Sequence, residues 1–374
     1  MELTHEQLEK SIDKSYSTGI PLFIAGTTGI GKSCTVRKVS KRIATNDEER
    51  EFLEWNELTS EEKRELRDSK EKREQSFLLI DMRISQMDPT DLRGLPNLNG
   101  EDFVEWNPPL SFSVLSKEGV RGVLFFDEIN LAPPSVQSAA YQIILDKAIG
   151  QISLNKNLCI IGAGNRVEDR ANVFEMAAPL KNRFTHVGLK VPSVEDWSIW
   201  ATENDIDNRI VGYLNFKRSH LMVDISKIGN SRSGAFPTPR SWEYCSNVID
   251  GLEDLDTLEQ FVSSCVGDGV AVEFKSFLKL KKDIDLMDVM DNPEKVKEMS
   301  LDLKWCLISA VADRYASHPE DLSKALNVAK HLEADFGATL LRMIKRSNEK
   351  HFMKNVQDCD EWEEIAKEYK KYIL

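Results

Sequence analysis

The feature that most constrains this chain is a glycine-rich segment near its start, Gly26-Thr27-Thr28-Gly29-Ile30-Gly31-Lys32-Ser33. It fills every fixed position of the phosphate-binding pattern G-x-x-x-x-G-K-[ST]. An apolar run at residues 22–25 predicts a buried strand before the segment, and residues 34–39 predict a helix after it. The alternative is a glycine turn between a strand and a helix that is followed by Lys32-Ser33 by chance, but such a turn does not need every fixed position of the pattern to match. The segment therefore predicts a nucleotide site in an α/β fold.

The residue types of this loop suit phosphate and magnesium. Glycines allow backbone N–H groups to face the phosphates, and the following helix adds its positive N-terminal end. We expect Lys32 to contact the β and γ phosphates and Ser33 to bind Mg²⁺. The remaining predicted nucleotide contacts are Gly26, Thr27, Thr28, Gly29, Ile30, Gly31 and Cys34. Nothing in these residues separates ATP from GTP.

Two further apolar runs end in polar residues that suit the same chemistry. Residues 122–126 lead into Asp127 and Glu128, which predicts a metal-binding carboxylate followed by the base that activates water. Residues 158–164 lead into Asn165, which is placed to sense the γ phosphate or fix the attacking water. Read alone, Asn165 is also an ordinary turn residue at a strand end.

Composition narrows the class of protein. A formal net charge of −13 over 374 residues argues against a surface built to coat nucleic acid, although it leaves a local basic patch open. No apolar run approaches the length of a membrane span, and the N-terminus is acidic where a secretory signal would be basic. The six cysteines are widely spaced and form no C-x-x-C pair. We expect a cytoplasmic protein with reduced thiols.

The segment at residues 47–74 departs from a compact domain because 19 of its 28 residues are charged, 12 acidic and 7 basic. Mixed signs at close spacing predict a solvent-exposed helix or helix pair with a thin apolar edge, formed by Phe52, Trp55 and Leu66. A docking arm for a partner is the alternative, and it depends on Trp55 being hard to leave exposed.

Beyond residue 190 the pattern changes from strands to helices. Residues 193–197 read as a serine-capped helix start, and apolar residues then recur at helical spacing. We expect an all-helical lid over residues 191–290 and a C-terminal helical extension over residues 291–374, where Pro293 and Pro319 mark breaks.

Together these motifs resemble the AAA+ ATPases, and specifically their MoxR-like, helix-two-insert branch. The phosphate loop and the strand that ends in Asp127 and Glu128 look like the two Walker motifs. The most specific part of the resemblance is the segment Asp127-Glu128-Ile129-Asn130-Leu131-Ala132-Pro133-Pro134-Ser135-Val136-Gln137. The resemblance covers roughly residues 5–250.

The resemblance implies an AAA+ P-loop NTPase core with a parallel sheet over residues 1–190, in which residues 95–118 are the helix-two insert loop. It implies roles for three further residues: Asn165 as first sensor, Arg183 as the arginine finger given to the adjacent subunit, and Arg240 as second sensor reaching from the lid. Arg240 lies in a segment that also reads as a proline-bounded helix start capped by Thr238 or Ser241.

The implied activity is ATP hydrolysis by a homo-oligomeric ring, expected to be a hexamer, that remodels, activates or loads a client protein in a chaperone-like way. A partner with a von Willebrand A domain is implied by the resemblance alone. Two other functions stay open: a nucleic-acid motor of the restriction, clamp-loading or packaging type, and a switch that binds nucleotide without turnover. Client identity, ring size and the role of the C-terminal helices are beyond the sequence.

Overall fold

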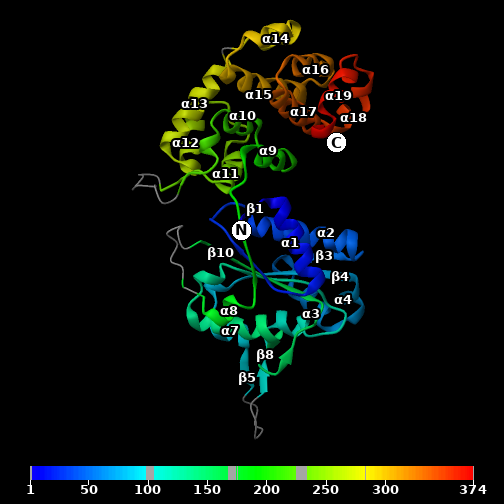
Figure 1. Cartoon of the computed structure of the whole chain (residues 1–374), viewed down its shortest axis with the longest axis vertical. Coiled ribbons are helices and arrows are strands. Elements are labelled where there is room, and N and C mark those ends of the chain that lie inside the picture. Colours follow the sequence, from blue (N-terminus) through cyan, green and yellow to red (C-terminus); the bar gives the residue numbers. More distant parts are fainter. Residues whose placement is uncertain are drawn as a thin grey trace. The chain divides into compact units, whose positions relative to one another are not determined.

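A computed structural model describes residues 2–97, 105–166, 174, 176–224, 234–282 and 284–373. The chain divides into two compact units, Met1–Val191 and Pro192–Leu374. The first unit contains a sheet flanked by helices, whereas the second is helical (Figure 1). Among the residues described, none of the helices has both the length and the apolar character needed to cross a bilayer.

Seven parallel strands form the sheet of the first unit, in the order β1-β11-β2-β10-β7-β4-β3. Their bounds are β1 Glu2–Leu3, β2 Leu22–Ala25, β3 Glu51–Glu54, β4 Ser76–Arg83, β7 Arg121–Asp127, β10 Leu158–Gly164 and β11 Thr185–Leu189. The central strands are nearly continuous apolar runs, as expected of strands covered on both faces. The predicted α/β class, with a parallel sheet followed by a helical region, is confirmed.

Helices cover both faces of this sheet. Helices α1 (His5–Thr18) and α2 (Lys32–Arg42) pack on one face, where their apolar residues join a cluster with Phe77, Val123 and Phe125. Helices α3 (Ser60–Asp68), α6 (Leu110–Leu115) and α7 (Pro134–Asp146) contribute to the cluster on the other face. Figure 1 shows α1 and α7 on opposite sides of the sheet. The remaining helices of this unit are α4 Lys70–Gln75, α5 Pro89–Arg93 and α8 Ala178–Lys181.

The charged segment at residues 47–74 contains a strand, β3, where the sequence predicts only helices. Strand β3 pairs in parallel with β4 and extends the sheet, and helices α3 and α4 then lead from β3 back to β4. Trp55 and Leu66 are buried in the core on the α7 side of the sheet. The segment is therefore an edge unit of the domain, and the burial of Trp55 removes the reason for reading it as a docking arm.

The predicted insert loop at residues 95–118 has two parts. An antiparallel hairpin, β5 (Leu95–Asn97) and β6 (Glu105–Asn107), exposes Leu95 and Trp106. Residues 98–104 between the two strands lie outside the described residues. Helix α6 follows, and it buries Phe112, Val114 and Leu115 in the core. A second hairpin, β8 (Ala148–Ile149) with β9 (Ile152–Ser153), follows α7.

The second unit consists of helices around one apolar core. The helices are α9 Val194–Glu203, α10 Asn208–Phe216, α11 Pro239–Ile249, α12 Leu255–Val266, α13 Asp268–Lys282, α14 Leu286–Asp291, α15 Leu301–Ser317, α16 Leu322–His331, α17 Ala334–Ser347, α18 Glu349–Asn355 and α19 Trp362–Ile373. Residues expected in the lid, such as Trp242 and Phe277, share this core with residues expected in the extension, such as Leu307 and Leu340. The two predicted segments therefore form one compact unit, because the apolar residues of both pack in the same core.

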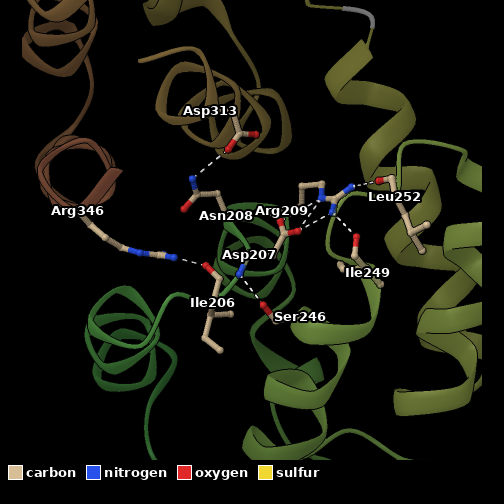
Figure 2. A network of polar contacts seen from close by, with 9 residues as sticks. All are labelled: Ile206, Asp207, Asn208, Arg209, Ser246, Ile249, Leu252, Asp313 and Arg346. Carbon is tan, nitrogen blue, oxygen red and sulfur yellow. Dashed lines mark hydrogen bonds and ion pairs between the residues drawn. The ribbon is translucent and has the colours of Figure 1, made fainter. Parts of the chain in front are cut away.

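A polar network at the start of α10 joins four segments of this unit (Figure 2). The Arg209 guanidinium pairs with Asp207 and donates to the carbonyl oxygens of Leu252 (2.6 Å) and Ile249 (3.0 Å), beyond and within α11. Arg346 of α17 donates to the carbonyl oxygen of Ile206 at 2.8 Å. Further bonds in the network are Asn208 to Asp313 of α15 and Asp207 to Ser246 of α11. The guanidinium groups of Arg209 and Arg346 thus donate to carbonyl oxygens within and after α11 and before α10.

Candidate nucleotide-binding site

The glycine-rich loop lies between β2 and α2, as its pattern predicts. Gly29 and Gly31 adopt φ values of 75° and 93°, in the left-handed region that side chains disfavour, and Gly31 caps the N-terminus of α2. A helix N-terminus has backbone N–H groups without partners in the helix, so this loop presents donors and a partial positive charge to an anion.

The Lys32 ammonium group is buried beneath this loop. Its Nζ atom donates to the carbonyl oxygens of Gly26 (2.6 Å) and Thr27 (2.9 Å), and to Oδ1 of Asn165 (3.2 Å). Lys32 and Asn165 are 133 positions apart in the chain, and the adjacent strands β2 and β10 bring them together. Two residues that the sequence assigned to one site are therefore in contact.

The Ser33 hydroxyl joins the loop to the strand β7. It donates to Oδ2 of Asp127 at 2.8 Å. A hydroxyl beside a carboxylate provides hard oxygen ligands, which Mg²⁺ prefers. In phosphate sites Mg²⁺ takes only one or two protein ligands and keeps several waters. The two residues thus fit the predicted ion. Within the described part of the chain, no cluster of three or more His, Cys, Asp or Glu residues provides a cage of protein ligands for a metal.

Glu128 has an unusual backbone conformation for a residue with a side chain, with φ 56° and ψ 34°. Its backbone N–H donates to Oδ1 of Asp127 (2.9 Å), and its Oε2 accepts from the Ser85 hydroxyl at 2.7 Å. Residues held in sparsely populated backbone regions cluster at functional sites, where the surroundings compensate the strain. The sequence did not indicate Ser85, because a single serine after a strand is common.

Asn130 fixes the backbone that carries Asn165. Its amide donates to the carbonyl oxygen of Asn165 (2.7 Å) and accepts from the backbone N–H of Asn165 (3.1 Å). The approach requires Gly164, because a Cβ atom there would lie 2.4 Å from Oδ1 of Asn130. The motif contained Asn130, but only the structure shows that it holds the backbone of Asn165.

Two more side chains approach the site from elements that the motifs do not include. The His5 ring, at the start of α1, forms a hydrogen bond through Nε2 with the carbonyl oxygen of Ile30 at 2.7 Å. Asp81 lies on β4, and burial together with the nearby charge of Asp127 raises its pKa to about 6. Neither residue has a sequence signal beyond its type, since each reaches the site through strand and helix placement.

The two predicted arginines are exposed, and neither side chain forms a hydrogen bond or ion pair with a described residue. Arg183 lies in the turn between α8 and β11 of the first unit. Arg240 lies in the first turn of α11 in the second unit, after a capping box in which Thr238 accepts from the Ser241 backbone. The expected helix start at this position is confirmed.

No family model matches this chain, and no curated protein matches it. Solved structures to which it is similar include a RuvB K64R mutant of Thermotoga maritima, at 15% identity over 74% of this chain and 68% of that chain, with a TM-score of 0.32. NtrX from Brucella abortus in complex with ADP is 14% identical over 84% of this chain and 65% of that chain, with a TM-score of 0.35. PCH-2 of C. elegans is 11% identical over 72% of this chain and 66% of that chain, with a TM-score of 0.32. Because these TM-scores are low, the functional assignment rests on the contacts of the site.

Proposed function

We propose that this chain is an ATPase of the AAA+ superfamily, of the MoxR-like type, that binds ATP with Mg²⁺ at the edge of the first unit's sheet. The observation that carries the proposal is the bond between Ser33 and Asp127 at 2.8 Å. It joins the phosphate loop to the acidic pair at the end of β7, 94 positions away, in the arrangement that phosphoryl transfer requires. Mg²⁺ held there would neutralise charge on the phosphates.

The residues divide the chemistry between them. When ATP binds, Lys32 exchanges its hydrogen bonds with the carbonyl oxygens of Gly26 and Thr27 for hydrogen bonds with phosphate oxygens. Phosphate oxygens suit the ammonium group because it has three donors and no acceptor. Glu128 takes a proton from the water that attacks the γ phosphorus, and ADP departs as the bond to the bridging oxygen breaks. Ser85 occupies one oxygen of the Glu128 carboxylate and so orients the other oxygen toward the water. Asn165, fixed by Asn130, contacts the γ phosphate or the water.

Assembly into a ring is part of the proposal. Arg183 is an exposed cation in the first unit, and it suits a finger that completes a neighbouring copy's site. Arg240 suits a sensor that acts from the second unit. The exposed Leu95 and Trp106 on the β5–β6 hairpin give such a ring an apolar contact for a client protein. A homohexamer, a protein client and a von Willebrand A partner stay proposals derived from the family resemblance.

Binding of ATP and GTP to the purified chain tests the proposal, with a Lys32→Ala variant and Lys38→Ala as the matched control. Lys38 is an exposed lysine of the same helix that pairs with Glu9 at 2.8 Å. We expect Mg²⁺-dependent ATP binding that is lost in K32A and kept in K38A. Equal binding by wild type and K32A would contradict the proposed site, and preference for GTP would change the substrate.

A further inference from the structure

Asp81 lies on the same face of the sheet as Asp127, one strand away. Strand β4 runs parallel to β7, with Asp81 opposite Phe125 and Arg83 opposite Asp127. Side chains alternate between faces along a strand. Phe77 and Leu79 of β4 share the α1–α2 cluster with Val123 and Phe125 of β7, so the next alternate positions, Asp81 and Asp127, also face α2.

One oxygen of the Asp81 carboxylate has no hydrogen-bond partner among the described residues. Oδ1 is a fully buried atom, although the side chain as a whole is only half-buried. The nearby guanidinium of Arg37 is engaged by Glu54, with Nε and Oε2 2.8 Å apart. A buried carboxylate oxygen without a donor is costly, and a second carboxylate on the same face increases that cost. The nearby guanidinium groups of Arg37 and Arg83 donate no hydrogen bond to this oxygen.

A magnesium ion with its bound waters provides both the positive charge and the donors. Mg²⁺ dehydrates reluctantly and usually keeps several waters in phosphate sites. Carboxylates that accept hydrogen bonds from metal-bound groups orient the inner ligands and increase metal affinity. Ser33 and Asp127 provide only one hydroxyl and one carboxylate, so the waters of the ion require acceptors from other residues.

We propose that Asp81 is a further positioning residue of the metal site, which accepts a hydrogen bond from a water bound to the Mg²⁺ held by Ser33 and Asp127. This inference rests on the proposed function. It assigns to strand β4 a part in metal binding in addition to its part in the sheet. The alternative is that Asp81 only balances the charge of Arg37 and Arg83 within the fold.

The test is the affinity of Mn²⁺ for the protein–ADP complex, measured by electron paramagnetic resonance, in wild type and Asp81→Asn. Asparagine keeps the size of the side chain and removes its charge. We expect D81N to weaken Mn²⁺ binding by about 10-fold or more, with ADP affinity in EDTA unchanged. A purely structural role would leave the Mn²⁺ affinity as it is. Glu57→Gln, an exposed carboxylate after β3, is the control and should match wild type.

Asp81→Ser serves as a second variant if D81N does not fold, because the serine side chain is smaller and also removes the charge. Equal Mn²⁺ affinity in wild type and in the folded Asp81 variant would overturn the inference and leave the proposed function standing. Failure of wild type to bind Mn²⁺ and ADP together would overturn the proposed function, and the inference with it.

Discussion

At the scale of single residues, the site depends on close approaches that only particular side chains permit. Lys32 reaches Asn165, Ser33 reaches Asp127, and Asn130 holds the backbone of Asn165. Lys32, Ser33, Asp127 and Asn165 were recognisable in the sequence because residues of these types stand at fixed positions in motifs. Ser85 and Asp81 were not, because only the pairing of β4 with β7 brings this strand and the turn after it beside Asp127 and Glu128.

Gly164→Ala tests the contact that fixes Asn165. The added Cβ would lie 2.4 Å from Oδ1 of Asn130 and 2.9 Å from Cζ of Phe23, so the amide must move. We expect a loss of about 1–3 kcal/mol in the free energy of unfolding and slower ATP turnover, measured by urea denaturation and phosphate release. Gly269→Ala is the control, since nothing lies within 4 Å of its added Cβ. If G164A matches G269A in both measurements, this contact has no role.

At the scale of elements, the strands of the site were predictable and the edge of the sheet was not. Long apolar runs before Asp127 and Asn165 identify β7 and β10. Strand β3 has four residues, two of them glutamates, within a segment dominated by charge, so local pattern favours helix there. Its pairing with β4 is a tertiary contact that overrides local preference. The segments predicted to be a lid and a separate extension likewise form one unit, because distant parts of the chain build their shared core.

The contact between α15 and the N-terminus of α17 predicts a pH dependence. Lys304 is buried and donates to Glu333 at 2.6 Å, which holds the pKa of Glu333 below its ordinary value of 4.5. Because the folded-state pKa is lowered, this stabilisation is present above pH 4.5 and is lost as pH falls through the folded-state pKa.

We expect Glu333→Gln to lower the free energy of unfolding by about 1 kcal/mol near neutral pH, a modest value because Glu333 is largely exposed. The deficit relative to wild type should shrink on acidification, as measured by urea denaturation. Glu253→Gln, an exposed glutamate in the loop after α11, should match wild type throughout. A deficit in E333Q that is constant at every pH would contradict the ion-pair explanation.

At the scale of the whole molecule, the proposed mechanism predicts that sites are completed between chains. Arg183 is exposed and has no described partner in its own chain, whereas Glu128 is held by Ser85 within its own chain. A ring in which one copy supplies the base and the next copy the arginine explains both placements.

Mixing of two inactive variants tests this division of labour. We expect Arg183→Ala to lower turnover on the order of 10³-fold, and Glu128→Gln to lower it as well. Mixed assemblies should regain activity, because the intact base of an R183A chain meets the intact arginine of an E128Q chain. Absence of regained activity in mixtures shown by native mass spectrometry to contain both variants would contradict an arginine finger supplied in trans.

The most direct test of the central claim is ATP hydrolysis by the Glu128→Gln variant, measured together with ATP binding. We expect E128Q to bind ATP and Mg²⁺ as wild type does and to release phosphate more slowly by a factor on the order of 10² or greater. Glu65→Gln, an exposed glutamate on α3, should hydrolyse ATP at the wild-type rate. Phosphate release by E128Q at the wild-type rate would contradict the assignment of Glu128 as the base, and with it the proposed mechanism.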